Sequence, residues 1–249
     1  MSSKIWVYWN KGWNNAPPVV QFCRRSWKKY SGDREIVYVT DANINEYLDV
    51  NSFPKNVRKA PIQAYSDYLR ISLIEKYGGV WLDATTFLTK PLDDWLPDYL
   101  KAWNLFMFSN ERPGRKIASW FIAGDKEHEA VVDWKAECDA YWLKHTKPHD
   151  YFWFHHLFHD VLEEQDFKYK WANVIKHDAP VHRWYKQEAM YANNPSYFAY
   201  FKDYKAKLNE IDPVIKNAIT SGVQSPVYKF DKGLKTNTKM FGLLENTLL

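Results

Sequence analysis

The chain has 249 residues, with 46% hydrophobic and 26% charged residues and a formal net charge of +4. This length fits one large domain, and such a chain buries roughly 70–75% of its unfolded surface without help from a metal or a disulfide. This net charge is too low to indicate a nucleic-acid-binding protein, for which a clustered basic face is expected. No apolar run in the sequence approaches the ~18 residues that a membrane-spanning helix needs.

Cysteine usage and the first residues indicate the compartment. Cys23 and Cys138 lie far apart and form no CxxC pair, so we expect free thiols in a reducing compartment. Residues 1–4 lead directly into a strand-like segment, without a basic-then-apolar signal region. These features predict a cytoplasmic protein. Lys28–Lys29 and Lys202–Lys207 are candidates for contact with anionic lipid at the inner face of the membrane, with solvated surface charge as the alternative.

Aromatic residues are unusually frequent: 13 Trp, 17 Tyr and 14 Phe. Trp and Tyr combine a flat apolar face with a polar group, which suits sugar rings and nucleobases. A core that is rich in large side chains explains the same composition, so the count alone does not decide between the two.

The first 45 residues indicate a strand, a helix and a second strand. Ile5–Trp9 is a short apolar run typical of a buried strand, and Glu35–Val39 is another. Between them, Pro17 and Pro18 open a helix that extends to Tyr30, because proline is tolerated in a first helical turn. This order predicts a parallel strand pair joined by a helical crossover.

The strongest helix is expected over Ala60–Tyr77, with Gly78 as its C-terminal cap. Gly79–Asp83 follows as a buried strand. Further strands are expected over 104–108 and 116–123, and further helices over 130–144, 150–165 and 203–218. We therefore predict one α/β domain over residues 1–249, with an open, mostly parallel sheet flanked by helices. Ligands bind such sheets beyond the carboxyl ends of the strands.

A carboxylate and a guanidinium fall together on the strongest helix. At about 100° per residue, Ser72, Glu75 and Lys76 share a face suited to solvent. Asp67 and Arg70 fall on roughly the opposite side, together with Gln63. Charges away from solvent are costly unless they are paired or bound to a ligand, so these residues form either an internal ion pair or part of a site.

Asp83 comes at the end of the strand that follows this helix, where a ligand is expected. A hard oxygen ligand at that position suits Mg²⁺ or Mn²⁺ bound to phosphate oxygens. The alternative is an Asp that caps the following turn.

The run SDYLRISLIEKYGGVWLDATTFLTKPLDDW, residues 66–95, resembles the DXD-type glycosyltransferases related to the glycosyltransferase domains of large clostridial toxins. Within these, it is most similar to the capsular polysaccharide synthesis protein family. The family pattern is a helix with S-D-x-L-R, two glycines, and a strand that ends in L-D-x-D/T. Weaker matches are the Trp of the first strand and the runs ASWFIAG and DYFWFHHLF.

The resemblance implies the nucleotide-sugar-binding fold called GT-A, with a donor half in residues 1–110 and an acceptor half in residues 111–249. By this analogy, Trp9 stacks on the nucleobase, and Asp67 and Arg70 contact the hydroxyls and phosphate of the donor. Asp83 contacts the ribose and a metal ion and, with Arg70, is expected to be catalytic. Guanidinium groups suit phosphate recognition, which agrees with these roles.

The predicted cofactor is Mn²⁺ or Mg²⁺, held by Asp83 and Thr85. Most related families carry a second carboxylate where Thr85 stands, and a hydroxyl brings no negative charge. The Thr85 hydroxyl therefore predicts weaker metal binding than in those families, and activity need not depend strictly on a metal ion. His177 or Asp178 is a candidate for a further ligand from later in the chain.

Candidates for the acceptor side and for catalysis come from the second half. Asp150 and His155 are predicted as acceptor-side or catalytic residues, with a helix cap and a half-buried histidine as the alternatives. His155 and His159 have the i, i+4 spacing that can hold a metal, beside His156.

Three aromatic residues and a lysine complete the predicted site. Trp120, Phe121 and Trp153 are expected on the acceptor side, with a place in the core as the alternative for Trp120 and Phe121. Lys229 is expected to contact the donor diphosphate, with a solvated lysine as the alternative.

The leading prediction is transfer of a hexose from a nucleotide-diphosphate sugar, preferably a UDP-sugar, to a hydroxyl of an oligosaccharide or lipid-linked acceptor in bacterial surface polysaccharide synthesis, with retention of anomeric configuration. One alternative is a non-catalytic protein that binds nucleotide sugars or carbohydrates. The other is a metal phosphohydrolase that uses His155 and His159.

Overall fold

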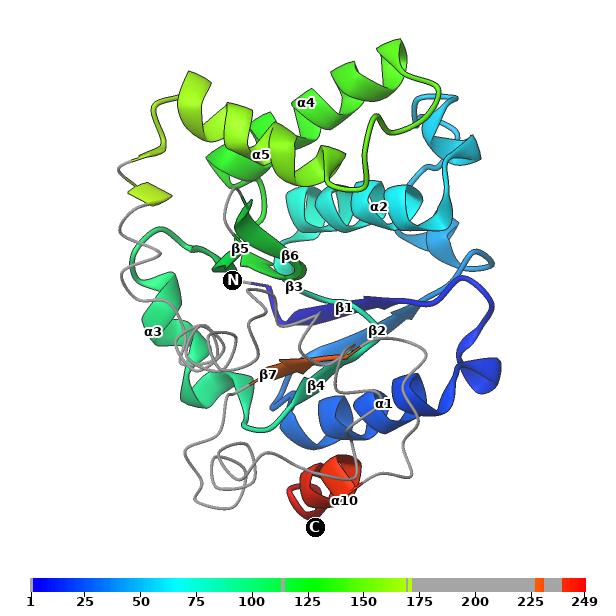
Figure 1. Cartoon of the computed structure of the whole chain (residues 1–249), viewed down its shortest axis with the longest axis vertical. Coiled ribbons are helices and arrows are strands. Elements are labelled where there is room, and N and C mark those ends of the chain that lie inside the picture. Colours follow the sequence, from blue (N-terminus) through cyan, green and yellow to red (C-terminus); the bar gives the residue numbers. More distant parts are fainter. Residues whose placement is uncertain (1, 113–114, 169, 172–226, 231–238) are drawn as a thin grey trace.

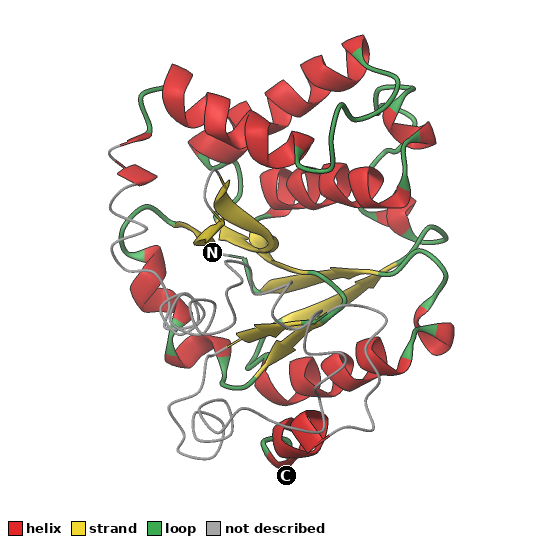
Figure 2. Ribbon diagram, viewed as in Figure 1, coloured by secondary structure: helices red, strands yellow, loops and turns green. Residues whose placement is uncertain are grey.

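The computed structural model describes residues 2–112, 115–168, 170–171, 227–230 and 239–249 (Figures 1 and 2). The described strands are β1 (Lys4–Tyr8), β2 (Glu35–Val39), β3 (Gly79–Leu82), β4 (Thr86–Leu88), β5 (Leu105–Arg112), β6 (Arg115–Gly124) and β7 (Val227–Lys229). The described α-helices are α1 (Pro18–Tyr30), α2 (Ile62–Tyr77), α3 (Leu96–Leu100), α4 (Glu129–Lys144), α5 (Trp153–Glu164) and α10 (Lys239–Asn246). The predicted elements before residue 165 are present, whereas β4, α3, β7 and α10 were not predicted.

The main sheet is mixed, with the strand order β2-β1-β3-β6-β5. β1 pairs in parallel with β2 and β3, whereas β6 runs antiparallel to both β3 and β5. The prediction of a mostly parallel sheet is therefore wrong for its second half. Only two residues separate β5 from β6 in the sequence, and a parallel connection needs a dozen or more.

Helices cover both faces of this sheet. Figure 1 shows α2, α4 and α5 on one side and α1 on the other. The pair formed by β4 and β7 adjoins α1, where the Trp27 indole N–H donates to the Thr86 carbonyl at 2.6 Å and Phe22 stacks on Phe87. The predicted boundary between donor and acceptor halves, at residues 110 and 111, falls inside β5, and β7 from the second half pairs with β4. The two halves thus share strands.

The connection from α2 to β3 depends on two glycines with positive φ angles. Gly78 ends α2 with φ 65°, and its N–H donates to the Ile74 carbonyl at 2.8 Å. The Trp6 indole N–H of β1 donates to the Gly78 carbonyl at 2.9 Å. Gly79 has φ 100°, and a Cβ there would overlap the Lys4 carbonyl oxygen of β1. Glycine is the residue that permits both conformations and this close approach, so β3 can lie directly beside β1.

The middle of α2 is buried on nearly every side, and α4 is one of the elements that pack against it. Of the three residues predicted to face solvent, Lys76 is exposed and Glu75 is half-buried. Ser72 is buried and its hydroxyl donates to the Tyr68 carbonyl at 2.8 Å, so its predicted solvent position is wrong. Gln63, expected on the covered face, is exposed in the first turn. The burial predicted for Asp67 and Arg70 is confirmed.

Membrane insertion finds no support in the helices. Every helix in the described ranges is too short or too polar to cross a bilayer.

Candidate active site

Asp83 directly follows β3, at the carboxyl ends of the parallel strands β1 and β3. Its backbone N–H donates to the Trp120 carbonyl of β6 at 2.9 Å, and its carbonyl accepts from Thr86 N–H at 2.9 Å. The side chain of Asp83 is 26% exposed, more than any other member of the charged cluster around it. The carboxylate therefore lies at the edge of the sheet where ligands of α/β proteins bind.

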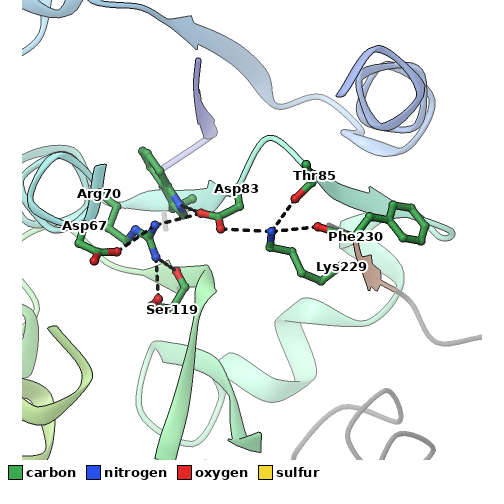
Figure 3. Close-up of polar contacts among 8 residues, drawn as sticks. Asp67, Arg70, Asp83, Thr85, Ser119, Lys229 and Phe230 are labelled. Carbon is green, nitrogen blue, oxygen red and sulfur yellow. Dashed lines mark hydrogen bonds and ion pairs between the residues drawn. The ribbon is translucent and has the colours of Figure 1, made fainter. Parts of the chain in front are cut away.

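The Arg70 guanidinium is the centre of this cluster (Figure 3). Its Nη2 lies 3.0 Å from Asp83 Oδ1 and 3.1 Å from Asp67 Oδ1, while Nη1 donates to the carbonyl and hydroxyl oxygens of Ser119 at 2.6 and 2.7 Å. The guanidinium also lies over the Trp81 ring, with 5.2 Å between Cζ and the ring centroid. Arg70 is only 5% exposed. These contacts fix the position of Asp83.

The two carboxyls of the cluster have opposite pKa shifts. Burial raises the pKa of Asp67 to about 7, against the effect of Arg70 and with a further rise from Asp83. Burial alone would also raise the pKa of Asp83. The Arg70 and Lys229 charges and hydrogen bonds from Trp81 and Lys229 more than offset it, so the pKa of Asp83 is below its usual range. Asp83 is thus the carboxylate that stays ionised at neutral pH.

The Lys229 ammonium lies on the other side of Asp83 (Figure 3). Its Nζ donates to Thr85 Oγ1 at 2.5 Å, lies 3.4 Å from Asp83 Oδ2, and is 3.5 Å from the Phe230 carbonyl. Its side chain is 6% exposed, so the alternative of a solvated lysine is wrong. The two predicted metal ligands are therefore bridged by a cation of the protein itself.

Asp83 and Thr85 consequently do not fit a divalent metal. Mg²⁺ and Mn²⁺ favour several oxygen ligands, above all carboxylates. Asp83 Oδ1 accepts from Arg70 and from the Trp81 indole, both at 3.0 Å, and Oδ2 faces Lys229. A metal ion between Asp83 and Thr85 would meet the ammonium directly. The other predicted ligands, His177 and Asp178, lie outside the described residues.

Trp9 immediately follows β1, one strand away from Asp83. The parallel register pairs Val7 with Leu82, so Trp9 and Asp83 emerge at the same edge of the sheet. Trp9 is half-buried, and its backbone N–H donates to the Val39 carbonyl at 3.0 Å. The backbone of Trp9 is therefore held beside β2, and the residue remains partly accessible.

The three aromatic residues predicted for the acceptor side lie in the core. Phe121 is fully buried, Trp120 stacks on Phe108 at 4.9 Å between ring centroids, and Trp153 is 1% exposed. This placement matches the core alternative and gives no support to an acceptor-side role. Trp153 instead adjoins the charged cluster, where its indole lowers the pKa of Asp67.

Asp150 is exposed before α5, and it contacts histidines other than those predicted. Its Oδ1 accepts from Phe152 N–H at 2.6 Å in the turn before α5. Phe152 is the N-cap of α5 and no side chain caps the helix, so the alternative of Asp150 as a helix cap is wrong. Its Oδ2 lies 3.1 Å from His156 Nε2 and 3.6 Å from His149 Nε2. Within the described residues, His149, Asp150 and His156 form the group whose ligand atoms approach one another as metal ligands do. His155 and His159 are both half-buried and are not in it.

Two contributors to the cluster were not predicted, Ser119 and Trp81. Ser119 lies in β6, which is antiparallel to β3, so its contact with Arg70 depends on the mixed sheet. The indole N–H of Trp81, two residues before Asp83, donates to its carboxylate. In a regular strand residues i and i+2 share a face, a local signal that could have identified Trp81.

A cavity of about 910 Å³ lies elsewhere, between the 48–56 segment, α2 and α4. It is lined by residues such as Tyr68, Glu75 and Asp139, and it shares no lining residue with the Asp83 cluster. We do not assign it to the donor, because the charged cluster at the sheet edge carries the relevant chemistry.

The raised pKa of Asp67 makes the stability of the protein depend on pH. The pKa is about 7 in the folded chain and ~3.9 when unfolded, so the folded state holds the extra proton between these values. The stability contributed by protonated Asp67 is fully present below about pH 4 and is lost as the pH rises through about 7. The free energy of unfolding of the wild type, minus that of Asp67→Asn, should be larger at pH 5 than at pH 8 in urea titrations. An equal or opposite difference would show that pairing with Arg70 outweighs burial.

The fold places this charged cluster beyond the carboxyl ends of two parallel strands, at the edge where open α/β sheets bind ligands. The chain belongs to the capsular polysaccharide synthesis protein family, whose model matches residues 1–209. The resemblance seen in residues 66–95 is thereby confirmed.

Curated relatives carry the names of glycosyltransferases. The chain is 29% identical over 148 residues to O-glycosyltransferase braB of Annulohypoxylon truncatum, covering 52% of this chain and 35% of that protein. It is 27% identical over 175 residues to O-glycosyltransferase PaGT of Phomopsis amygdali, covering 58% and 43%. It is 29% identical over 115 residues to the initiation-specific alpha-1,6-mannosyltransferase of Saccharomyces cerevisiae, covering 40% and 22%. The chain is thus a homologue of glycosyltransferases, and it spans less than half the length of these relatives.

A solved structure, the PaToxG glycosyltransferase, aligns with a TM-score of 0.47 and 14% identity, over 92% of this chain and 89% of that chain.

Proposed function

We propose that this chain is a glycosyltransferase that moves a hexose from a nucleotide-diphosphate sugar, preferably a UDP-sugar, to a hydroxyl of a saccharide or lipid-linked saccharide. The observation that carries the proposal is the cluster of Asp67, Arg70, Asp83 and Lys229 at the carboxyl edge of the sheet. Homology to glycosyltransferases gives this cluster its chemical context. A GT-A type of donor site, a role in bacterial surface polysaccharide and a location at the cytoplasmic face of the membrane belong to the same proposal.

The proposed donor site lies across the ends of β1 and β3. Trp9 stacks on the nucleobase, and the exposed edge of Asp83 accepts hydrogen bonds from donor hydroxyls. Arg70, enclosed by Asp67, Asp83 and Ser119, acts as a positioning residue that holds the Asp83 carboxylate in place. Orientation of this kind is a principal source of catalysis when no protein nucleophile takes part.

The proposed transfer proceeds with retention of anomeric configuration. The bond between the anomeric carbon and the diphosphate oxygen breaks, with its electron pair staying on the diphosphate. The acceptor hydroxyl oxygen forms the new bond, and its proton passes to the departing diphosphate. The protein contributes positioning and stabilisation of charge in a partly desolvated site.

Nucleotide-sugar binding tests the proposal. Among UDP-, GDP-, dTDP- and CMP-sugars, we expect one nucleotide class to raise the melting temperature of the purified chain, because a ligand at ~100 times its Kd adds about 2.7 kcal/mol of stability. In Trp9→Ala, the same ligand should bind about 5- to 160-fold more weakly, since loss of base stacking costs roughly 1–3 kcal/mol.

Tyr151→Ala is the matched control, because it removes an exposed aromatic ring from the loop before α5. It should bind the ligand as the wild type does. A flat response to the whole panel would contradict the donor site. Binding of a donor without any turnover would instead favour the non-catalytic binding function.

A further inference from the structure

We propose that the Lys229 ammonium serves in place of a divalent cation in this site, so that donor binding and turnover need no metal ion. This inference rests on the proposed glycosyltransferase function. It concerns the two motif positions, Asp83 and Thr85, at which a metal was expected from the sequence.

The position of the ammonium is the first support. Lys229 Nζ contacts Thr85 Oγ1 at 2.5 Å and lies 3.4 Å from Asp83 Oδ2, so it bridges the side chains that a metal ion would have to bridge. Thr85 offers a hydroxyl rather than a carboxylate. A hydroxyl is a good acceptor for an ammonium and a weak ligand for a hard divalent cation.

The backbone holds Lys229 in this position. β7 pairs antiparallel with β4, with Lys229 opposite Thr86, and Phe230 N–H donates to the Thr85 carbonyl at 2.9 Å. The lysine is therefore held by main-chain pairing beside Thr85, which directly precedes β4. Its side chain is only 6% exposed, so a metal ion could take its place only if the groups that cover it also moved.

The charge balance of the cluster is the second support. Whether Asp67 is ionised or protonated, the two positive charges of Arg70 and Lys229 equal or exceed the negative charge of Asp67 and Asp83, so the cluster has no net negative charge to attract a metal ion. To bind a divalent cation, the carboxylates of Asp67 and Asp83 would have to be unpaired. Each of them already lies within 3.4 Å of Arg70 or Lys229. The cluster is complete as a set of ion pairs.

The chemical task of the ammonium is to stabilise the leaving group. As the bond from the anomeric carbon to the diphosphate breaks, negative charge grows on the diphosphate oxygen. A fixed positive charge beside that oxygen lowers the barrier, and it is most effective where water is excluded. Lys229, beside the exposed edge of Asp83, is placed to supply this charge.

The first experiment compares metal-free and metal-containing conditions for the wild type. The purified chain is stripped with EDTA, and its residual metal content is measured by elemental mass spectrometry. Thermal shifts with UDP-, GDP-, dTDP- and CMP-sugars, and release of the nucleoside diphosphate or monophosphate, are then measured in EDTA and in Mn²⁺. We expect the shift and the turnover in EDTA to be within about twofold of those in Mn²⁺, since no metal takes part in stabilising the charge.

The second experiment replaces Lys229 by methionine, which removes the ammonium charge and keeps an unbranched apolar side chain. Lys229→Met should lose the ligand-induced shift in EDTA and at least about 100-fold in turnover, which is typical of losing one group that stabilises transition-state charge. Lys101→Met is the matched control, because it makes the same change at a lysine whose side chain is 75% exposed. It should keep both the ligand shift and the turnover.

Three outcomes of these experiments distinguish metal-independent transfer, metal-dependent transfer and the absence of the proposed function. Equal behaviour in EDTA and Mn²⁺ supports the inference, and it does not depend on whether the Lys229→Met variant folds. Binding and turnover that appear only with Mn²⁺ overturn the inference and leave the glycosyltransferase function standing. No response to any nucleotide sugar in either condition overturns the proposed function and the inference together.

Discussion

Replacing Asp83 by asparagine is expected to reduce donor turnover by at least about 100-fold while it leaves the fold intact. The amide oxygen can still accept from Arg70 and Trp81, both 3.0 Å from Asp83 Oδ1 in the wild type. The variant lacks the negative charge that pairs with Lys229 and Arg70, and it presents an amide where the donor hydroxyls need a carboxylate. The measurement is steady-state release of nucleoside diphosphate, with the unfolding midpoint in urea as the check on folding.

Arg70→Ala provides the contrast. It should lose turnover as well, but it also leaves Asp67 and Asp83 without their shared partner, which typically costs about 3–5 kcal/mol for a buried pair. A folded Asp83→Asn variant with near-normal turnover would remove Asp83 from the mechanism. A fully stable Arg70→Ala variant would show that the buried cluster does not hold this part of the fold together.

Replacing Gly79 by alanine is expected to cause the largest loss of stability of any single methyl addition considered for this chain. The φ of 100° strains any other residue by roughly 1–3 kcal/mol. The new Cβ would also overlap the Lys4 carbonyl oxygen of the neighbouring strand, and forcing strands apart costs about 1–3 kcal/mol more. We expect a total of about 3–5 kcal/mol in urea unfolding, a large part of the ~5–15 kcal/mol that stabilises a typical protein.

Gly12→Ala separates the backbone strain at a positive φ from the steric overlap with a neighbouring strand. Gly12 also has a positive φ, 81°, but a Cβ there would meet no atom within 4 Å. It should show the backbone strain without the overlap, and so a smaller loss than Gly79→Ala. Equal losses in the two variants would contradict the close approach of β3 to β1. Because Asp83 directly follows β3, Gly79→Ala should also lower turnover at temperatures where the variant is still folded.

The elements that the sequence predicted well are those specified by local patterns. The helix that ends at Gly78, the two glycines and the apolar strand up to Leu82 follow one another without a gap, and each has its own chemical signal. The burial of Asp67 and Arg70 followed from helical periodicity together with Asp83 immediately downstream. Short parallel pairing of β1 with β2 likewise followed from the strand, helix and strand order.

Contacts between distant segments could not be predicted in the same way. Lys229 and Thr85 are 144 positions apart, and the three-residue strand β7 has no periodicity long enough to recognise. Ser72 has the polarity of a surface residue, but it is buried within the packed middle of α2. Ser119 reaches Arg70 because β6 runs antiparallel to β3, an orientation that depends on the short connection from β5.

The aromatic composition is explained mainly by packing. Trp6, Trp27, Trp81, Trp134, Trp142 and Trp153 are all among the most completely buried side chains of the described residues. Several of them also donate from the indole N–H to the main chain, as Trp6 does to Gly78 and Trp134 to Phe154. Large rings thus serve the core, and Trp9 is the tryptophan at the edge of the candidate site that is left partly accessible.

The most direct test of the glycosyltransferase assignment is a turnover measurement on the purified chain with UDP-, GDP-, dTDP- and CMP-sugars. Mass spectrometry would follow both the released nucleotide and the sugar, on water or on simple saccharide acceptors. We predict that one nucleotide class is cleaved between the sugar and the phosphate, and that Asp83→Asn slows the reaction by at least about 100-fold. A chain that binds one of these donors tightly but leaves it intact under every condition would contradict the assignment and identify a binding protein instead.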